Sequence, residues 1–491
     1  MRRTGMGCAL HSGAVICVLA GLAAAMSAQA QAQGEVAPSK SNGQTVQALL
    51  VSDIHFEPFW DPGKVEHLAK APASEWNAIL AEPEAADRQA RFDGLQQKCK
   101  ARGVDTPYAL YQSSLRAIKE NASGAKFVLV SGDLIAHDFD CKFRTVLPKA
   151  PAAEYRMFAQ KTIRYVMEEL RAALKGVPVY AALGNNDTDC GDYQIDPNSR
   201  FLEATGRMLT ADVPAGERAE ALRTFADGGY YNVKLPAPLE HTRLVVLDDL
   251  FMSWRYETCA GQENPAPSAS QMVWLEQQLD AARRKREKVW VMAHIPPGVN
   301  AYATAVKGVD VCSGGKPQTF LKSEALPEAL APYGDVIELA VFAHTHMDEV
   351  RLLKPTAAGS PPQGVAVKMV PSISPIDGNH PSFTVAEVDA ATGEMKDYRV
   401  ISASNLTGVD ATWTEEYDFA QAYKEPAYTA ATVAELIAGF KADATAQTDA
   451  SRNYIRDYGS GMRELGLFWK PYICTLTNGD ADAFRKCVCG K

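Results

Sequence analysis

The chain has 491 residues, of which 46% are hydrophobic and 22% are charged, and its formal net charge is −9. This length allows one large domain with a smaller one, or two to three domains, and the composition is ordinary for a soluble globular protein. A global negative field argues against binding to a nucleic-acid polymer, although it leaves room for a local basic pocket.

The first 30 residues have the features of a secretory signal peptide. Arg2-Arg3 provides a basic start, residues 14–26 form a short apolar run, and Ala28-Gln29-Ala30 reads as a cleavage site with small residues. The run is too short to span a membrane, and no other segment is a candidate span. We therefore expect export to the periplasm or the exterior after cleavage near Ala30, a lead-in segment at residues 31–44, and no stable membrane anchor.

Eight cysteines lie beyond this segment, and an even number in an exported chain predicts up to four disulfides. The many possible pairings leave the connectivity open. The close pair Cys487 and Cys489 also leaves open a metal site built from thiolates. The eight residues are Cys99, Cys141, Cys190, Cys259, Cys312, Cys474, Cys487 and Cys489.

Short apolar runs rich in β-branched residues recur along the chain, as is typical of strands that are covered on both faces. The predicted strands are 46–51, 127–130, 177–183, 244–247, 289–293, 339–342, 364–370, 383–388 and 398–401. Helical patterns separate several of them, and the predicted helices are 108–119, 154–175, 270–288, 433–446 and 453–464. This alternation predicts a layered α/β domain at residues 45–405, followed by a small helical, cysteine-containing region at residues 406–491.

Five of the predicted strands end in clusters of polar residues. The clusters contain Asp53 and His55; Asp133, His137 and Asp138; Asn185; His294; and His344 and His346. Ligand sites in open α/β sheets form at the carboxyl ends of strands, so we expect the clusters to meet. In an extended chain, residues two apart point to the same side, which would let Asp53 and His55 reach one centre together. The same spacing applies to His344 and His346.

Two aspartates, one asparagine and four histidines of these clusters provide seven candidate metal ligands. Neutral imidazole and carboxylate oxygen bind Zn²⁺, Mn²⁺ or Fe. Seven ligands suit two metals that share a bridging carboxylate better than one tetrahedral ion. A single histidine after a strand is more often a hydrogen-bonded structural residue, and an aspartate after glycine is usually a turn residue or helix cap. Five such clusters together favour the metal site.

The order D-x-H, G-D, G-N, H and H-x-H resembles the calcineurin-like metallophosphoesterase superfamily. The detail is similar to the acid sphingomyelinase-like phosphodiesterases, which share the GDxxxHD segment at residues 132–138 and an Asn-rich, Pro-containing loop at residues 374–383. The motifs cover roughly residues 45–400. The resemblance implies a central β-sandwich flanked by helices, and a site with two divalent metal ions that are typically zinc, with Mn²⁺ or Fe as other possibilities.

The resemblance also implies a role for each candidate ligand. Asp53, His55 and His346 would bind one metal; Asn185, His294 and His344 would bind the other; and Asp133 would bridge them. Two such metals clamp phosphoryl oxygens and lower the pKa of a bound water to about 7, which yields a bridging hydroxide that attacks phosphorus in line. A metal-dependent phosphoric ester hydrolase is therefore expected.

The chain departs from the superfamily at residues 184–187, where it reads G-N-N-D instead of G-N-H-[DE]. The usual histidine orients phosphate or protonates the leaving oxygen, whereas the amide of Asn186 can hydrogen-bond a phosphoryl oxygen but cannot supply a proton. We therefore expect Asn186 to bind substrate and His137 to act as the general acid. The alternative for His137 is a structural pair with Asp138. His380 is either a second substrate-binding residue or a surface turn residue.

Residues 31–44 are too few for the saposin-like domain that precedes the catalytic domain of mammalian acid sphingomyelinases. The resemblance therefore implies a saposin-free phosphodiesterase with a small phosphoester substrate, either a head-group phosphodiester or a nucleotide. One alternative is a phosphoanhydride hydrolase that acts on polyphosphate or nucleotides, because vacuolar endopolyphosphatases also carry G-N-N-D. Another is a metal-binding protein without turnover, which the replacement at Asn186 suggests. The sequence does not predict the oligomeric state.

Overall fold

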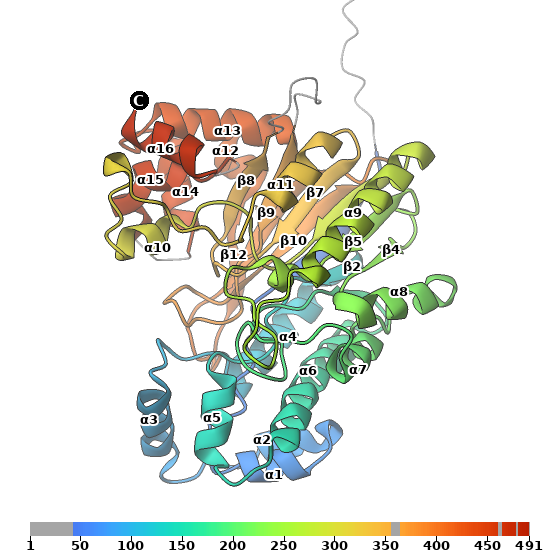
Figure 1. The fold of residues 1–491 in the computed structure, drawn as a ribbon, viewed down its shortest axis with the longest axis vertical. Coiled ribbons are helices and arrows are strands. Elements are labelled where there is room, and N and C mark those ends of the chain that lie inside the picture. Colours follow the sequence, from blue (N-terminus) through green and yellow to red (C-terminus); the bar gives the residue numbers. More distant parts are fainter. Residues whose placement is uncertain (1–42, 355–363, 460–463, 478–479, 491) are drawn as a thin grey trace, which may run out of the picture. The chain divides into compact units, whose positions relative to one another are not determined.

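Two mixed sheets, each with six strands among the described residues, form the centre of the fold (Figure 1). The computed structural model describes residues 43–354, 364–459, 464–477 and 480–490. The predicted signal peptide and residues 31–42 of the predicted lead-in lie outside these ranges. The first sheet has the strand order β12-β11-β10-β1-β2-β3, and the second has the order β4-β5-β6-β7-β9-β8.

Parallel strands lie at the centre of both sheets. Neighbours β1, β2 and β3 run parallel in the first sheet, and β5, β6, β7 and β9 run parallel in the second. The strands are β1 (Thr45–Val51), β2 (Ala125–Val130), β3 (Val179–Ala181), β4 (Tyr231–Lys234), β5 (Thr242–Val246), β6 (Lys288–Met292), β7 (Ile337–Phe342), β8 (Glu349–Leu353), β9 (Val365–Met369), β10 (Ser382–Asp389), β11 (Met395–Ala403) and β12 (Trp413–Asp418). The carboxyl ends of each parallel set therefore share one edge of their sheet.

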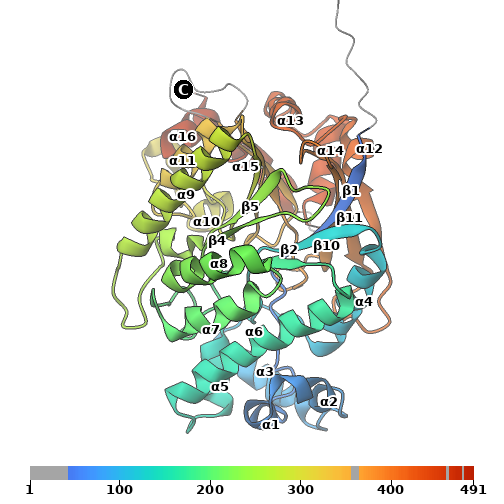
Figure 2. The ribbon, with the colours of Figure 1, turned by 90° about the vertical axis from the view of Figure 1, so that its right-hand side faces the viewer.

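Helices cover the sheets and fill the connections between strands. The α-helices are α1 (Val65–Lys70), α2 (Trp76–Leu80), α3 (Arg88–Cys99), α4 (Tyr108–Asn121), α5 (Phe139–Val146), α6 (Ala152–Leu174), α7 (Arg200–Leu209), α8 (Ala215–Gly228), α9 (Ala266–Lys285), α10 (Ala301–Val306), α11 (Ala325–Leu330), α12 (Phe419–Tyr423), α13 (Ala430–Ala442), α14 (Asp449–Asp457), α15 (Trp469–Ile473) and α16 (Ala481–Cys489). Short 3₁₀ helices are η1 (Ala73–Glu75), η2 (Asp249–Met252), η3 (Val311–Ser313), η4 (Ala331–Tyr333) and η5 (Glu464–Phe468). Figure 2 shows α4, α6, α7 and α8 next to one another beside the strands.

Strand β6 shows how the layers pack, because its alternate residues face different cores. Trp290 belongs to the larger core, which also contains residues of the first sheet, and its ring lies edge-on to Phe127 of β2 with centroids 5.6 Å apart. Val291 belongs to a second core with Leu275 of α9. The sheets therefore pack on each other while α9 covers the outer face of the second. This confirms the predicted layered α/β fold with a central sandwich.

All nine predicted strands are present, and the sequence reading missed β4, β8 and β12. The last of these pairs with β11 and extends the first sheet past residue 405, so the predicted division there stays a prediction, while α12 to α16 confirm a helical C-terminal region. The predicted helix at 453–464 corresponds to α14, which ends at Asp457, and part of its predicted end lies outside the described residues. The other four predicted helices correspond to α4, α6, α9 and α13.

Four disulfides join all eight cysteines beyond the predicted signal peptide. The pairs are Cys99–Cys141, Cys190–Cys259, Cys312–Cys489 and Cys474–Cys487. The alternative of a thiolate metal site at Cys487 and Cys489 is therefore wrong, because each of the two residues is bonded to another cysteine. Two of the bonds tie α16 to neighbouring segments, one of which contains η3.

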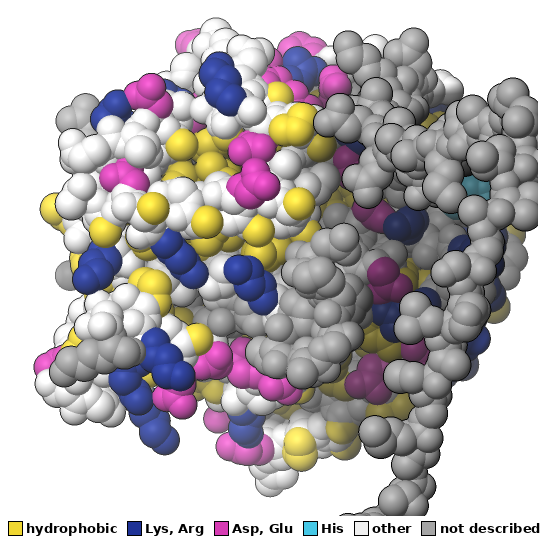
Figure 3. Space-filling view, turned by 90° about the horizontal axis from the view of Figure 1, so that it is seen from above, with side chains coloured by type: hydrophobic (Ala, Val, Ile, Leu, Met, Phe, Trp, Pro, Cys, Tyr) yellow, Lys and Arg dark blue, Asp and Glu magenta, His cyan; other side chains and the backbone are white. Residues whose placement is uncertain are grey.

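Within the described residues, we find no helix with both the length and the apolar character needed to cross a membrane. On the face shown in Figure 3, basic and acidic side chains are interspersed among hydrophobic ones. This mixture agrees with the modest net charge of the chain.

Candidate metal centre

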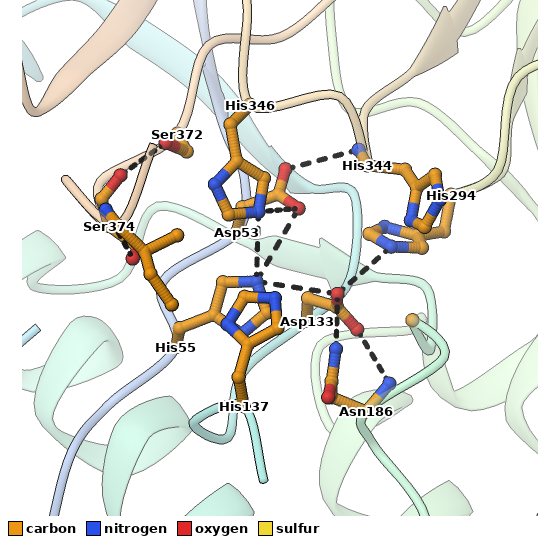
Figure 4. A network of polar contacts seen from close by, with 12 residues as sticks. Asp53, His55, Asp133, His137, Asn186, His294, His344, His346, Ser372 and Ser374 are labelled. Atoms are coloured by element: carbon orange, nitrogen blue, oxygen red, sulfur yellow. Dashed lines mark hydrogen bonds and ion pairs between the residues drawn. The ribbon is translucent and has the colours of Figure 1, made fainter. Parts of the chain in front are cut away.

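The seven predicted ligands come together where parallel strands of both sheets end (Figure 4). Each lies in the segment that directly follows a strand. Asp53 and His55 follow β1, Asp133 follows β2, Asn185 follows β3, His294 follows β6, and His344 and His346 follow β7. The sequence-based expectation that these clusters meet agrees with the geometry, while the metal-binding roles remain proposals.

The carboxylate of Asp133 lies between two groups of candidate metal ligands, which we call the first and second halves of the centre. In the first half, Nε2 of His55 lies 3.3 Å from Oδ2 of Asp133 and 3.2 Å from Nε2 of His346. Nε2 of His346 in turn lies 3.4 Å from Oδ1 of Asp53. Asp53, His55 and His346 make up this half, and Asp133 closes it.

The second half consists of Asn185, His294 and His344. Nε2 of His294 lies 3.1 Å from Oδ2 of Asp133 and 3.2 Å from Oδ1 of Asn185. Asp133, His294 and His344 each place a potential ligand atom within 4.8 Å of the others. The same oxygen of Asp133 therefore faces a histidine of each half, as a bridging carboxylate would.

The backbone of these loops corrects one step of the sequence reasoning. Asp53 and His55 have φ angles of 46° and 43°, and His344 and His346 have φ angles of 71° and 65°. Their side chains therefore reach the centre from left-handed backbone, not from the extended chain that the spacing suggested. Asp133 has a φ of 57° as well. Such conformations cost roughly 1 kcal/mol or more per residue and concentrate at functional sites.

Close backbone packing explains the glycines of the G-D and G-N motifs. Gly132 has a φ of 98°, and a Cβ atom there would lie 2.7 Å from the backbone nitrogen of Gly184. A Cβ atom on Gly184 would lie 2.1 Å from Oδ1 of Asp133. We call the segments that follow β2 and β3 the β2 loop and the β3 loop. Glycine at both positions lets these loops approach closely enough to place Asp133 and Asn185 in one centre.

Backbone carbonyls orient two of the histidine rings. Nδ1 of His55 donates to the carbonyl of Ile135 at 2.9 Å, and Nδ1 of His294 donates to the carbonyl of Ser131 at 2.8 Å. Each ring therefore directs Nε2 towards Asp133, which is the usual arrangement for a metal-binding histidine. Both carbonyls belong to the β2 loop, so this segment positions histidines from both sheets.

The electrostatics of the centre fit a site for cations. Burial lowers the pKa of His55 and His294, but the carboxylate of Asp133 and its neighbours outweigh burial and raise these pKa values to about 9 and about 10. Burial raises the pKa of Asp133, yet His294 and His55 hold it well below its usual value. Without cations, protons on these two rings balance the buried carboxylate charge, and divalent cations could replace them.

An unsatisfied oxygen gives a second sign of fit. Oδ1 of Asp53 is buried and accepts no hydrogen bond within the described part of the chain. A buried carboxylate oxygen without a hydrogen bond is costly even with imidazoles nearby, and a cation would satisfy it. The two halves together offer carboxylate oxygens, one amide oxygen and imidazole nitrogens, which is a donor set that Zn²⁺, Mn²⁺ and Fe accept.

Asn186 contacts the shared carboxylate directly. Its backbone nitrogen donates to Oδ1 of Asp133 at 2.8 Å, and its side-chain Nδ2 donates to Oδ2 at 2.9 Å. The side chain thus orients Asp133. The predicted hydrogen bond from Asn186 to a phosphoryl group stays a prediction, for which the second N–H of the same amide is available.

His137 lies against the first half of the centre. Its ring stacks on His55 with centroids 3.9 Å apart, and its side chain is 19% exposed. The alternative that His137 pairs with Asp138 is wrong, because Nδ1 of His137 donates to Oδ1 of Asp105 at 3.0 Å instead. Arg102 donates to Nε2 of His137 at 3.2 Å. Sequence reasoning gave Asp105 and Arg102 no role.

Three further residues that the sequence reading did not assign support the ligands. Asp187 is fully buried and accepts from the backbone nitrogens of Leu134 at 2.7 Å and Gly184 at 3.0 Å, which joins the β2 and β3 loops. Asp192 accepts from Nδ2 of Asn185 at 2.7 Å. The hydroxyl of Tyr193 lies 3.3 Å from Nε2 of His344. The position of Asp187 in the G-N-N-D motif was the available signal, and Asp192 and Tyr193 gave none.

His380 lies apart from this network. It is half-buried, its carbonyl accepts from Oγ of Ser382 at 2.7 Å, and it belongs to none of the groups that could hold a metal within the described ranges. Its predicted role in substrate binding stays a prediction.

All seven candidate ligands lie within the part of the chain that matches one protein-family model. The calcineurin-like phosphoesterase model matches residues 47–348. Acid sphingomyelinase-like phosphodiesterase 3b from Homo sapiens is 27% identical over 406 residues, which is 78% of this chain and 80% of that protein. The cyclic GMP-AMP phosphodiesterase SMPDL3A from Bos taurus is 25% identical over 336 residues, which is 65% of this chain and 66% of that protein.

Among solved structures, the chain is similar to a dimetal phosphatase from Danio rerio, with 13% identity and a TM-score of 0.39. The likeness covers 76% of this chain and 99% of that one. At this score it adds no argument to the family match.

Proposed function

Because this chain belongs to the calcineurin-like phosphoesterase family, we propose that it is an exported phosphodiesterase that hydrolyses a small phosphodiester with two zinc ions. The relatives described above are phosphodiesterases by name, one of them for cyclic GMP-AMP. The proposed substrates are therefore head-group phosphodiesters or nucleotides.

The position of Asp133 is the observation that carries this proposal. Its Oδ2 lies 3.3 Å from Nε2 of His55 and 3.1 Å from Nε2 of His294, and these residues come from different sheets. Asp53, His55 and His346 would hold one cation, and Asn185, His294 and His344 the other, with Asp133 common to both. A pair of cations in this site would polarise the phosphoryl oxygens and lower the pKa of water that attacks phosphorus.

The protein side chains have three tasks in this proposal. Asn186 keeps Asp133 in the orientation that serves both halves and offers an N–H to a phosphoryl oxygen. In its doubly protonated form, His137 would carry a proton at Nε2 in place of the hydrogen bond that this nitrogen accepts from Arg102, and would pass it to the leaving oxygen as the phosphorus–oxygen bond breaks. The ring is suited to this task because it adjoins the first half through His55 and still reaches solvent.

Export is supported by the cysteines. Four disulfides among the described residues accord with an oxidising compartment, since disulfides are rare where thiols are kept reduced. N-terminal sequencing of the secreted protein tests this part of the proposal, and a start near residue 31 is the expected result.

Hydrolysis assays with metal analysis test the activity. We expect the purified protein to cleave bis-p-nitrophenyl phosphate faster than p-nitrophenyl phosphate or ATP, to contain about two metal ions per chain, and to lose activity to a chelator and regain it with Zn²⁺. Preference for ATP or polyphosphate would instead indicate a phosphoanhydride hydrolase. Bound metal without turnover of any of these compounds would contradict an enzymatic role. A comparison of glycerophosphocholine with cyclic GMP-AMP separates head-group from nucleotide substrates.

A further inference from the structure

Asp105 is a fully buried carboxylate that contacts His137 twice. It lies in the segment between α3 and α4, which follows no strand. Its Oδ2 accepts from the backbone nitrogen of His137 at 2.8 Å, and its Oδ1 accepts from Nδ1 of the same residue at 3.0 Å. One carboxylate therefore fixes both the backbone and the ring of His137, which restricts the rotation of that ring.

Two other chain segments hold Asp105 in place. Oγ of Ser374, in the segment after β9, donates to Oδ1 of Asp105 at 2.9 Å. Nζ of Lys142 lies 3.8 Å from Oδ2 of Asp105 and is also paired with Glu57, and both of these charged groups are buried. Three hydrogen-bond donors and a nearby ammonium group offset the cost of burying the carboxylate, which therefore stays ionised.

The contacts of Asp105 determine which nitrogen of His137 carries the proton in the neutral ring. A carboxylate only accepts, so Nδ1 keeps its hydrogen and the second nitrogen, Nε2, is the one left for proton exchange. The stacking on His55, with an interplanar angle of 25°, fixes the plane of the ring at the edge of the first half. Nη2 of Arg102, whose side chain is 54% exposed, donates to Nε2 and also lies 3.4 Å from Oδ2 of Asp377, so this guanidinium must move before Nε2 can take up a proton.

We propose that Asp105 is a positioning residue that sets the orientation and tautomer of His137, with Ser374 as its support. This inference rests on the proposed function, because it presumes that His137 protonates the leaving group. Asp105 makes no hydrogen bond or ion pair with the seven candidate ligands in the described part of the chain, although its charge raises the pKa of His55, so its direct contacts lead to the centre through His137. A purely structural link between three loops is the competing explanation.

The substitution Asp105→Asn separates the two explanations because it keeps size and shape. The amide replaces one acceptor oxygen with a donor, so the backbone N–H and the Nδ1 hydrogen of His137 can no longer both be satisfied in the same orientation. In serine proteases, the equivalent change in an Asp–His pair leaves the geometry intact and lowers kcat by about 10⁴-fold through the wrong tautomer. The pair of Lys142 and Glu57 remains intact in this variant, so we expect folding.

The decisive measurement compares two diesters with the same nucleotide part, the p-nitrophenyl and phenyl esters of thymidine 5′-monophosphate. Phenol is the poorer leaving group and depends more on a general acid. For Asp105→Asn we expect kcat to fall about 100-fold with the phenyl ester and less than tenfold with the p-nitrophenyl ester, with unchanged KM and metal content. In the His137→Ala background, the same substitution should cause no further loss.

Asp138→Asn is the matched control. Asp138 adjoins His137 in sequence but makes no side-chain cap to α5, and its φ of 56° suits asparagine. We expect unchanged rates with both esters. If Asp105→Asn slows both esters equally, or slows His137→Ala further, Asp105 has a structural role and the inference is wrong.

Two measurements keep the inference testable if Asp105→Asn fails to fold. Ser374→Ala leaves both bonds from His137 to Asp105 and should reduce kcat a few-fold, again mainly with the phenyl ester; equal reduction for both esters contradicts the inference. Nitrogen-15 spectra of histidine rings in the metal-free protein should show the Nδ1–H tautomer for His137, assigned by its loss in His137→Ala. The opposite tautomer overturns the inference. Failure of the proposed function looks different, since His137→Ala would then cleave the phenyl ester at the wild-type rate.

Discussion

Four buried or partly buried histidines of the candidate centre divide into two pairs with opposite acid–base behaviour. The pKa values of His55 and His294 are raised to about 9 and about 10, whereas that of His344 is lowered to about 3 and that of His346 is also well below its usual value. Burial lowers all four. Only the first pair lies directly against Oδ2 of Asp133, which raises its pKa values, whereas the charges of His294 and His55 add to burial in lowering the pKa values of His344 and His346.

The two pairs also differ in how the chain holds them. His55 and His294 donate Nδ1 to carbonyls of Ile135 and Ser131, on either side of Asp133 in the β2 loop. His344 and His346 follow the same strand, β7, and make no such bond to this loop within the described residues. The β2 loop therefore provides both the carboxylate charge of Asp133 and the carbonyls that orient the rings of the first pair. The second pair reaches the centre from the end of β7 in the second sheet.

The substitution Asp133→Asn tests this difference with the largest expected effect. Loss of the shared charge should lower the pKa values of His55 and His294 and weaken cation binding in both halves of the centre. We expect a loss of activity on the order of 1000-fold or more, and metal content well below that of the wild type. Metal analysis after dialysis and hydrolysis of bis-p-nitrophenyl phosphate measure both. A variant that retains two metals per chain would show that Asp133 is not shared.

Single-ligand variants address each half separately. His294→Ala removes a donor of the second half and His346→Ala a donor of the first, while Asp133 stays in both variants. We expect each to keep about one metal per chain and to lose activity about 100-fold, because two-metal hydrolysis needs both ions. His380→Ala is the matched control, since that residue lies apart from both halves, and it should retain both metals. Loss of both metals in either ligand variant would mean that the halves do not bind independently.

Asn186→Ala tests how firmly the shared carboxylate must be held. The variant removes the donor at 2.9 Å from Oδ2 of Asp133 but keeps the backbone donor to Oδ1. Partners of ligating carboxylates typically contribute 10- to 100-fold, so we expect about a tenfold loss in metal affinity, measured by competition with a chelator. An unchanged affinity with reduced kcat would instead support the predicted contact of Asn186 with the phosphoryl group.

The candidate ligands could be predicted from the sequence because each is a metal-binding residue type that follows a short apolar run typical of a buried strand. Asp105 could not be found this way, since it lies in an irregular segment between helices and meets His137 only through the tertiary fold. Strand β8 was missed for a related reason: Glu349 and Arg351 are charged yet buried, and pair with each other inside the protein. Charged residues at these positions indicate a surface segment, but their pairing in the folded protein allows a buried strand instead.

The left-handed backbone at the candidate ligands could not be predicted from the sequence either. A D-x-H spacing fits extended backbone, whereas the φ values of Asp53 and His55 are positive because backbone bonds to the β2 loop hold both residues. The nitrogen of Asp53 donates to the carbonyl of Gly132 at 3.0 Å, and that of His55 donates to the carbonyl of Asp133 at 2.9 Å. Only the folded partner loop reveals this constraint.

The pH dependence of the metal-free protein gives a smaller effect that separates the two histidine pairs. Raised pKa values mean that His55 and His294 contribute stability below about pH 6.5 that is lost as the pH rises through about 9 and 10. The lowered pKa of His344 costs stability as the pH falls from about 6.5 to about 3. We expect the melting temperature to decline on both sides of a neutral range. Added Zn²⁺ should abolish the alkaline decline, and its persistence would contradict the exchange of protons for cations.

Tyr193→Phe should have the smallest effect, because it changes the surroundings of only one ligand. The tyrosine hydroxyl lies 3.3 Å from Nε2 of His344, while Arg255 lies over the tyrosine ring, 4.0 Å from its centroid, and keeps the ring in place. The variant retains the ring and loses only the hydroxyl. We expect a few-fold change in metal affinity for the second half and none for the first, as measured by stepwise zinc titration. A larger change in the first half would mean that Asp133 transmits strain between the halves, and that the two histidine pairs respond as one unit.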